Sequence, residues 1–91
     1  MIIPIKQARE ILRIDGNDND DIIIPLLKVI PEYLDTTTGY RAHKGIFSPL
    51  AVTTASFLLQ LWYNPDGTDT ERLQRTINNL LTALSCTVQR N

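Results

Sequence analysis

The stretch that decides the fold lies in the second half of the chain, where residues 48–63 read SPLAVTTASFLLQLWY. Ser48 followed by Pro49 is typical of a helix start, because serine caps free backbone amides and proline suits the first helical position. The residues that follow carry no charge and repeat apolar side chains at helical spacing. We predict a helix over residues 49–63, and its inward stripe consists of Leu50, Ala51, Ala55, Leu58, Leu59 and Trp62.

This predicted helix is apolar around most of its surface, since Val52, Phe57 and Leu61 lie outside the inward stripe. Such a helix is buried on more than one side, and in a small chain another subunit can cover one of those sides. A membrane span is the competing interpretation of the uncharged residues 45–65. However, the helical part would measure only about 22 Å, against about 30 Å of hydrocarbon in a bilayer. We therefore expect a central buried helix and no membrane span.

Amphipathic patterns elsewhere in the chain predict three more helices. They cover residues 4–13, 20–37 and 69–84, and residues 85–91 are expected to form a polar, frayed tail. Thr68 and Glu71 have the spacing of a capping box at the start of the last helix. All four glycines fall between these patterns, where turns and helix ends accept them. With short loops and no strand alternation, the sequence predicts an all-α fold, a bundle of about four helices in a single domain over residues 1–91.

The predicted helix over residues 20–37 carries both a start signal and two potential breaks. Asp18 or Asn19 is expected to cap its first turn with a side-chain oxygen. Pro25 and Pro31 each remove a backbone donor and clash one turn back, at a cost of about 3 kcal/mol in a free helix. We therefore expect this second helix to be kinked or locally irregular.

Composition excludes several classes of protein. The 91 residues suit one domain, and 43% hydrophobic with 21% charged residues is typical of a globular chain. A formal net charge of −1 argues against a general nucleic-acid binder, which needs a dense positive field. The single cysteine, Cys86, cannot form an internal disulfide, which favours an intracellular protein. One cysteine and one histidine cannot make a zinc site within one chain.

Residues with chemical potential are few. The acidic run over residues 15–21 is similar in outline to a calcium loop, but Asp20 stands where glycine is needed and Leu26 where glutamate is needed. His43 has no neighbouring nucleophile motif. Cys86 lies near the C-terminal end of the last predicted helix, where the helix dipole does not activate a thiol. The sequence therefore predicts no catalytic, metal-binding or cofactor-binding residues, and no enzyme.

The remaining candidates suggest contacts with other macromolecules. Aromatic and apolar side chains left over after the inward stripes are interface candidates. These are Ile22, Val29, Tyr40, Val52, Phe57 and Tyr63. Arg41, His43 and Lys44 form a short basic loop that suits either a phosphate backbone or an acidic protein surface.

A series of short motifs carries a family resemblance. In chain order they are Leu12-Arg13-Ile14-Asp15, Asp20-Asp21, Glu32-Tyr33-Leu34, Thr38-Gly39, Leu61-Trp62-Tyr63-Asn64 and Leu80-Leu81. In this order and spacing the chain resembles the head–tail connector family (head-completion adaptors) of long-tailed bacteriophages and prophages. The resemblance covers about residues 5–85, and the block from Leu12 to Gly39 is its most specific part.

The resemblance implies a structural role. Members of the family are small helical proteins that assemble as rings of about twelve or thirteen copies under the portal of the capsid. Such a ring extends the DNA channel and docks the next stopper or tail protein. Its location would be the head–tail interface of the virion, and the host cytoplasm before assembly. DNA would pass without specific binding, which suits a weakly acidic chain.

A small helical DNA-binding or regulatory module is the alternative. The helix predicted over residues 4–13 carries Lys6, Arg9 and Arg13. A helix-turn-helix protein needs a polar recognition helix that presents base-reading side chains. Suitable side chains occur on the last predicted helix, namely Arg72, Gln74, Arg75, Asn78 and Asn79.

Overall fold

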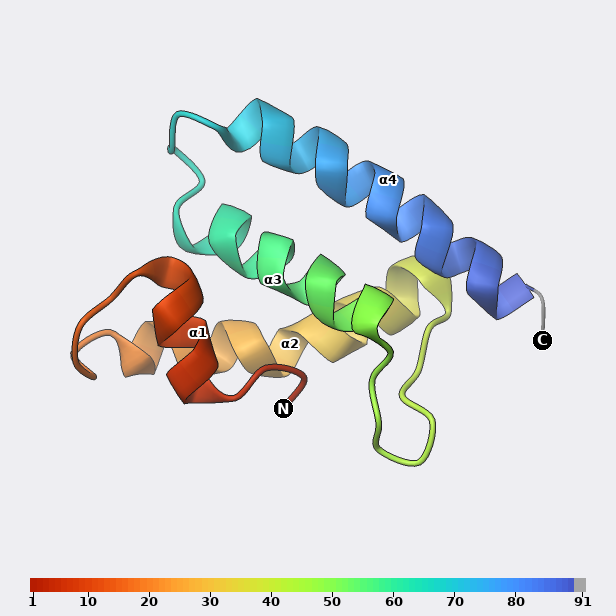
Figure 1. The fold of residues 1–91 in the computed structure, drawn as a ribbon, viewed down its shortest axis with the longest axis horizontal. Helices are drawn as coiled ribbons and strands as arrows, with labels where there is room; N and C mark the ends of the chain where they lie inside the picture. Colours follow the sequence, from red (N-terminus) through yellow and green to blue (C-terminus); the bar gives the residue numbers. More distant parts are fainter. Residues whose placement is uncertain (90–91) are drawn as a thin grey trace.

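The chain folds into four helices in the computed structural model, which describes residues 1–89 (Figure 1). They are α1 (Ile5–Leu12), α2 (Asp20–Thr38), α3 (Pro49–Tyr63) and α4 (Thr70–Gln89). Within this part of the chain the only β pairing is an isolated bridge between His43 and Ile46. The predicted all-α bundle is therefore confirmed, and no described helix has both the length and the apolarity to cross a membrane.

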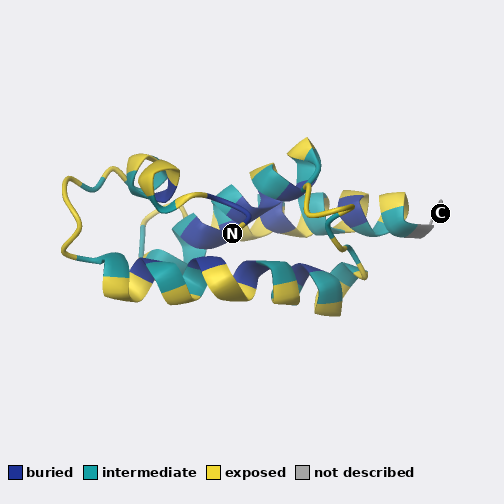
Figure 2. Cartoon of the chain, turned by 90° about the horizontal axis from the view of Figure 1, so that it is seen from below, coloured by how far each residue is buried: buried dark blue, intermediate teal, exposed yellow. Residues whose placement is uncertain are grey.

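The central position predicted for α3 is confirmed, because α3 contacts each of the other three helices. α3 and α4 lie side by side with opposite chain directions (Figure 1). The buried residues, dark blue in Figure 2, lie mainly on the sides of the helices that face one another. The buried apolar core is Ile2, Ile3, Ala8, Ile23, Leu27, Ile30, Leu34, Ala51, Ala55, Leu58, Leu59, Ile77 and Leu84.

The start of α3 follows the sequence prediction closely. Ser48 is the N-cap, and its Oγ accepts a hydrogen bond of 3.2 Å from the Ala51 amide. Pro49 is the first helical residue, where its missing N–H costs nothing. The first helix is shorter than the predicted range 4–13, because Pro4 is its N-cap and Arg13 lies in the left-handed region.

The start of α2 corrects one prediction. Asn19 occupies the N-cap position, but its side chain makes no cap hydrogen bond. Instead, its amide donates 3.0 Å to the Tyr63 hydroxyl at the far end of α3. The helix starts without a side-chain cap because a tertiary hydrogen bond uses the side chain that the local pattern assigned to capping.

The two prolines do not break α2. The helix is continuous from Asp20 to Thr38, so the locally irregular helix that the sequence suggested does not appear as an interruption. Buried residues flank both Pro25 and Pro31, and tertiary packing of that face holds the helix through them. The four buried side chains are Ile23, Leu27, Ile30 and Leu34.

The end of α4 also differs from the prediction. The helix reaches Gln89, so residues 85–89 are helical rather than a frayed tail, and residues 90–91 lie outside the described part. Val88 is half-buried, and the Thr87 hydroxyl donates 2.6 Å to the Leu84 carbonyl. At the other end, Asp69 precedes the first helical residue, one position after the threonine of the predicted capping box.

Candidate functional site

The loop between α2 and α3 contains a tight two-residue turn, which we call the 43–46 hairpin. His43 and Ile46 exchange two backbone hydrogen bonds, each of 3.0 Å. The two residues between them, Lys44 and Gly45, have φ values of 52° and 76°. Positive φ at both central positions is characteristic of a type I′ turn, whose twist matches that of a β-hairpin. The loop therefore has a tip of defined turn geometry.

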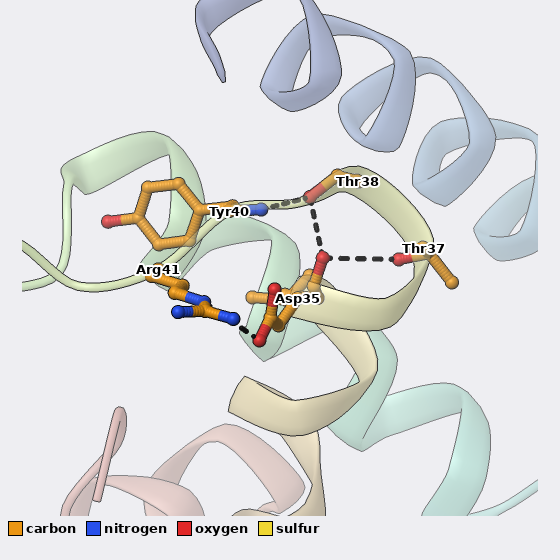
Figure 3. A network of polar contacts seen from close by, with 6 residues as sticks. Asp35, Thr37, Thr38, Tyr40 and Arg41 are labelled. Atoms are coloured by element: carbon orange, nitrogen blue, oxygen red, sulfur yellow. Dashed lines mark hydrogen bonds and ion pairs between the residues drawn. The ribbon is translucent and has the colours of Figure 1, made fainter.

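Polar contacts fix the base of this loop on the end of α2 (Figure 3). The Tyr40 amide donates 3.1 Å to the Thr38 hydroxyl, and the Tyr40 hydroxyl accepts 2.7 Å from the Ser48 amide. Arg41 Nε donates 3.0 Å to Asp35 Oδ2. Tyr40 thus joins the end of α2 to the N-cap of α3, and Arg41 joins the loop to the last turns of α2.

A mostly apolar groove lies between this loop, the first turn of α3 and the last turns of α4. Its volume is about 750 Å³. Tyr40, Leu50 and Val88 contribute apolar surface to its walls, and Ile46 on the hairpin is 72% exposed. Arg41 and His43 also line it, so a predominantly apolar groove has a basic rim.

The structure brings together the basic part of the predicted site. Arg41, His43 and Tyr40 line one groove, and Lys44 lies at the exposed tip of the same hairpin. The sequence analysis missed Ile46, which lies in a loop without periodicity. It also missed Val88, which continues the spacing of Ile77 and Leu84 one turn beyond the predicted end of the last helix. Ile46 follows a Lys-Gly pair and precedes Phe47, and this local pattern does not distinguish it from an ordinary loop residue.

The other predicted interface residues do not form one surface with that groove. Ile22 and Val29 are 54% and 42% exposed on α2, with exposed Pro25 between them at helical spacing. By contrast, Val52, Phe57 and Tyr63 are half-buried and pack against the core. A charged substitution at any of these three would therefore disturb the fold as well as any interface.

An ion pair that the sequence analysis did not anticipate joins α1 to α2. Arg9 and Asp20 make a two-pronged contact, with Arg9 Nε donating 2.9 Å to Asp20 Oδ1 and Arg9 Nη2 donating to Oδ2. The hydrogen bond from Arg9 lowers the pKa of Asp20, and the same contact raises the pKa of Arg9. Arg9 is therefore not free to contribute to a basic patch on α1.

The described residues offer little for metal or acid–base chemistry. Among them, no three side chains of the histidine, cysteine, aspartate and glutamate types gather closely enough to hold a metal ion. Cys86 is exposed on α4.

No family model, curated protein or solved structure matches the chain. The candidate site is thus defined by its geometry, as an apolar groove with a basic rim.

Proposed function

We infer that this protein is a structural adaptor that works by self-assembly. One observation carries this inference: the chain exposes apolar side chains that its core does not need. Ile46 is 72% exposed, and Ile22 and Val29 add a separate apolar stripe on α2. A closed core of aliphatic side chains already exists without them. Exposed apolar surface beyond the needs of the core is typical of protein–protein contacts.

The particular assembly follows from the family resemblance of the sequence. We propose a ring beneath the portal of a phage or prophage capsid, which extends the DNA channel and docks a stopper or tail protein. The partners are further copies of this chain, the portal protein and the next protein of the tail. The small helical body and the absence of excess positive charge support this role, since DNA has to pass without being held.

Native mass spectrometry of the chain, alone and with a candidate portal protein from the same genome, tests the proposal. We expect the wild-type chain to form a closed ring, alone or on the portal. Val29→Glu puts a charge on the exposed stripe of α2 and should prevent ring formation while the chain stays helical. Asn79→Glu, on the exposed face of α4, is the matched control and should assemble normally. Failure of the wild-type chain to join the portal would contradict the adaptor role.

The alternative DNA-binding role keeps one supporting observation. Several polar side chains are exposed along α4, and these are Arg72, Gln74, Arg75, Asn78 and Asn79. However, α4 lies along α3 with opposite direction (Figure 1), whereas a helix-turn-helix sets its two helices at a steep angle. Titration with duplex DNA at two salt concentrations separates the two roles. A DNA-binding module would bind the duplex with an affinity that falls as salt rises, whereas an adaptor would bind it weakly at both concentrations.

A further inference from the structure

The first observation is the chemistry of the groove beside the 43–46 hairpin. Tyr40, Leu50 and Ile46 make it apolar, and Ile46 is mostly exposed. Lys44 is exposed at the tip of the hairpin, and His43 lies beside it on the rim. Arg41 already pairs with Asp35. Lys44 makes no ion pair with a described residue, so its charge is open to an incoming ligand, which should combine an apolar side chain with negative charge.

The second observation is a surface of matching chemistry on the same chain. At the start of α2, Ile22 is 54% exposed, and Asp18 and Asp21 are exposed beside it. Asp20 forms an ion pair with Arg9, whereas Asp18 and Asp21 form no ion pair with a described residue. Asp18 precedes the N-cap Asn19, and Asp21 directly precedes Ile22 in the first turn of α2, so acidic and apolar groups share this short segment.

The two surfaces cannot meet within one molecule. They lie at opposite ends of α2, whose 19 residues span about 28 Å at about 1.5 Å per residue. Figure 1 shows the loop before α2 and the loop after it at opposite ends of the molecule. Contact between these surfaces therefore requires a second copy of the chain.

We propose that the first turn of α2 of one copy docks into the groove of the next copy. Ile22 enters the apolar groove against Ile46 and Leu50, and Asp21 and Asp18 face Lys44 and His43. The two surfaces are different, so each docked copy keeps one free surface of each kind. Head-to-tail contacts of this type produce closed rings or filaments. This contact would join neighbouring subunits of the adaptor, and only its closure into a ring rests on the proposed function.

Charge reversal tests the contact directly. Lys44→Glu and Asp21→Lys should each lower the self-association constant about tenfold or more, since each places like charges opposite one another. A chain with both reversals restores opposite charges across the contact and should recover most of the association. Arg75→Glu reverses an exposed charge on α4, at a residue that belongs to neither surface, and serves as the matched control for Lys44→Glu. Circular dichroism confirms that every variant remains helical.

Mixing the two single variants adds a second readout. In the mixture, the unchanged α2 surface of the Lys44→Glu chain meets the unchanged groove of the Asp21→Lys chain. The two substituted surfaces meet each other with opposite charges, so assembly should return in alternating copies. Native mass spectrometry with one isotopically labelled variant should then find equal numbers of both chains.

Three results would overturn the contact. One is normal assembly of either single variant. Another is a failure of association to recover in both the double variant and the mixture. The third is a wild-type chain that stays monomeric up to about 1 mM.

These results are separate from those that bear on the adaptor role. If the chain joins the portal but both single variants assemble normally, the adaptor role stands and the proposed contact fails. If self-association depends on the two charges but the chain never binds the portal, the contact stands and the adaptor role fails.

Discussion

Arg13 holds a backbone conformation that glycine usually supplies. Its φ of 57° and ψ of 46° lie in the left-handed region, directly after the last residue of α1. Its amide donates to the Glu10 carbonyl, and the Ile14 amide donates to the Arg9 carbonyl. This pair of bonds is the Schellman motif, which satisfies the last carbonyls of a helix. Here the motif closes α1 at the cost of a strained arginine.

Replacing this arginine should therefore stabilise the protein. We expect Arg13→Gly to raise the free energy of unfolding by about 0.5 to 1 kcal/mol. Glycine removes the strain of the left-handed conformation, and this gain exceeds the entropy cost of ordering glycine on folding. Urea denaturation measures the change. Arg13→Ala removes the same charge but keeps the strain, so it should give no such gain. An equal gain from both variants would show that charge, rather than the backbone, is responsible.

The contact between Asp20 and Arg9 makes stability depend on pH. The hydrogen bond from Arg9 holds the pKa of Asp20 below its usual range, so this carboxylate stabilises the fold above its unfolded pKa. That contribution is lost as the pH falls through the lowered value. We expect the thermal midpoint to drop below about pH 4. Asp20→Asn should be less stable at pH 7 and should lose less stability on acidification. Asp18→Asn, without an ion pair to a described residue, should follow the wild type.

The same ion pair shows what residue patterns could not reveal. The acidic run was predicted to place Asp20 in the first turn of a helix, and this is confirmed. The partner of Asp20 depends on how α1 packs against α2, because the chain reverses between residues 13 and 19. Asn19 is a similar case, since its bond to Tyr63 joins residues 44 positions apart. Patterns within a few residues indicate helix caps and favourable charges at helix ends. They do not show which residues that are distant in the chain come into contact.

At the scale of elements, α2 is stable in spite of its prolines. Pro25 is exposed within the helix, where it removes one backbone donor and packs little apolar surface. We expect Pro25→Ala to raise the free energy of unfolding by about 2 kcal/mol. Proline costs free energy inside a helix, and part of this cost is offset because proline lowers the entropy of the unfolded chain. Urea denaturation checks this value. Pro49→Ala, at the first position of α3, should give no gain because no hydrogen bond is missing there. Similar gains at both positions would contradict the explanation.

Helical periodicity predicted the helix boundaries to within one residue at every helix end except one. The exception is the end of α4. Its last turns carry few apolar residues, so the pattern stopped at Leu84, whereas Val88 keeps the helix packed beside Gly39. The buried Ile2 and Ile3 were also missed, because a segment of irregular backbone has no period to detect.

At the scale of the whole molecule, the candidate groove illustrates the limit of sequence patterns. Its walls come from three separate segments: residues 39–48, the first turn of α3 and the end of α4. Only the first segment contained a recognisable cluster, the basic loop. Ile46 drew no attention in the sequence, and its role became visible only when the type I′ turn placed it on the exposed tip. A groove assembled from distant segments requires the fold to be known.

The opposite charges at the two ends of the molecule imply a specific response to salt. The chain is nearly neutral overall and extends 41 Å along its longest axis, so end-to-end attraction is not cancelled by general repulsion. Raising ionic strength from about 0.01 M to about 1 M shortens the Debye length from about 30 Å to about 3 Å. We expect the self-association constant to fall steeply over this range, as measured by analytical ultracentrifugation, while the thermal midpoint changes little.

Ile46→Ser should weaken association at both ionic strengths by similar factors, because apolar contact is not screened. Association that strengthens with salt would contradict the contribution of opposite charges to the contact.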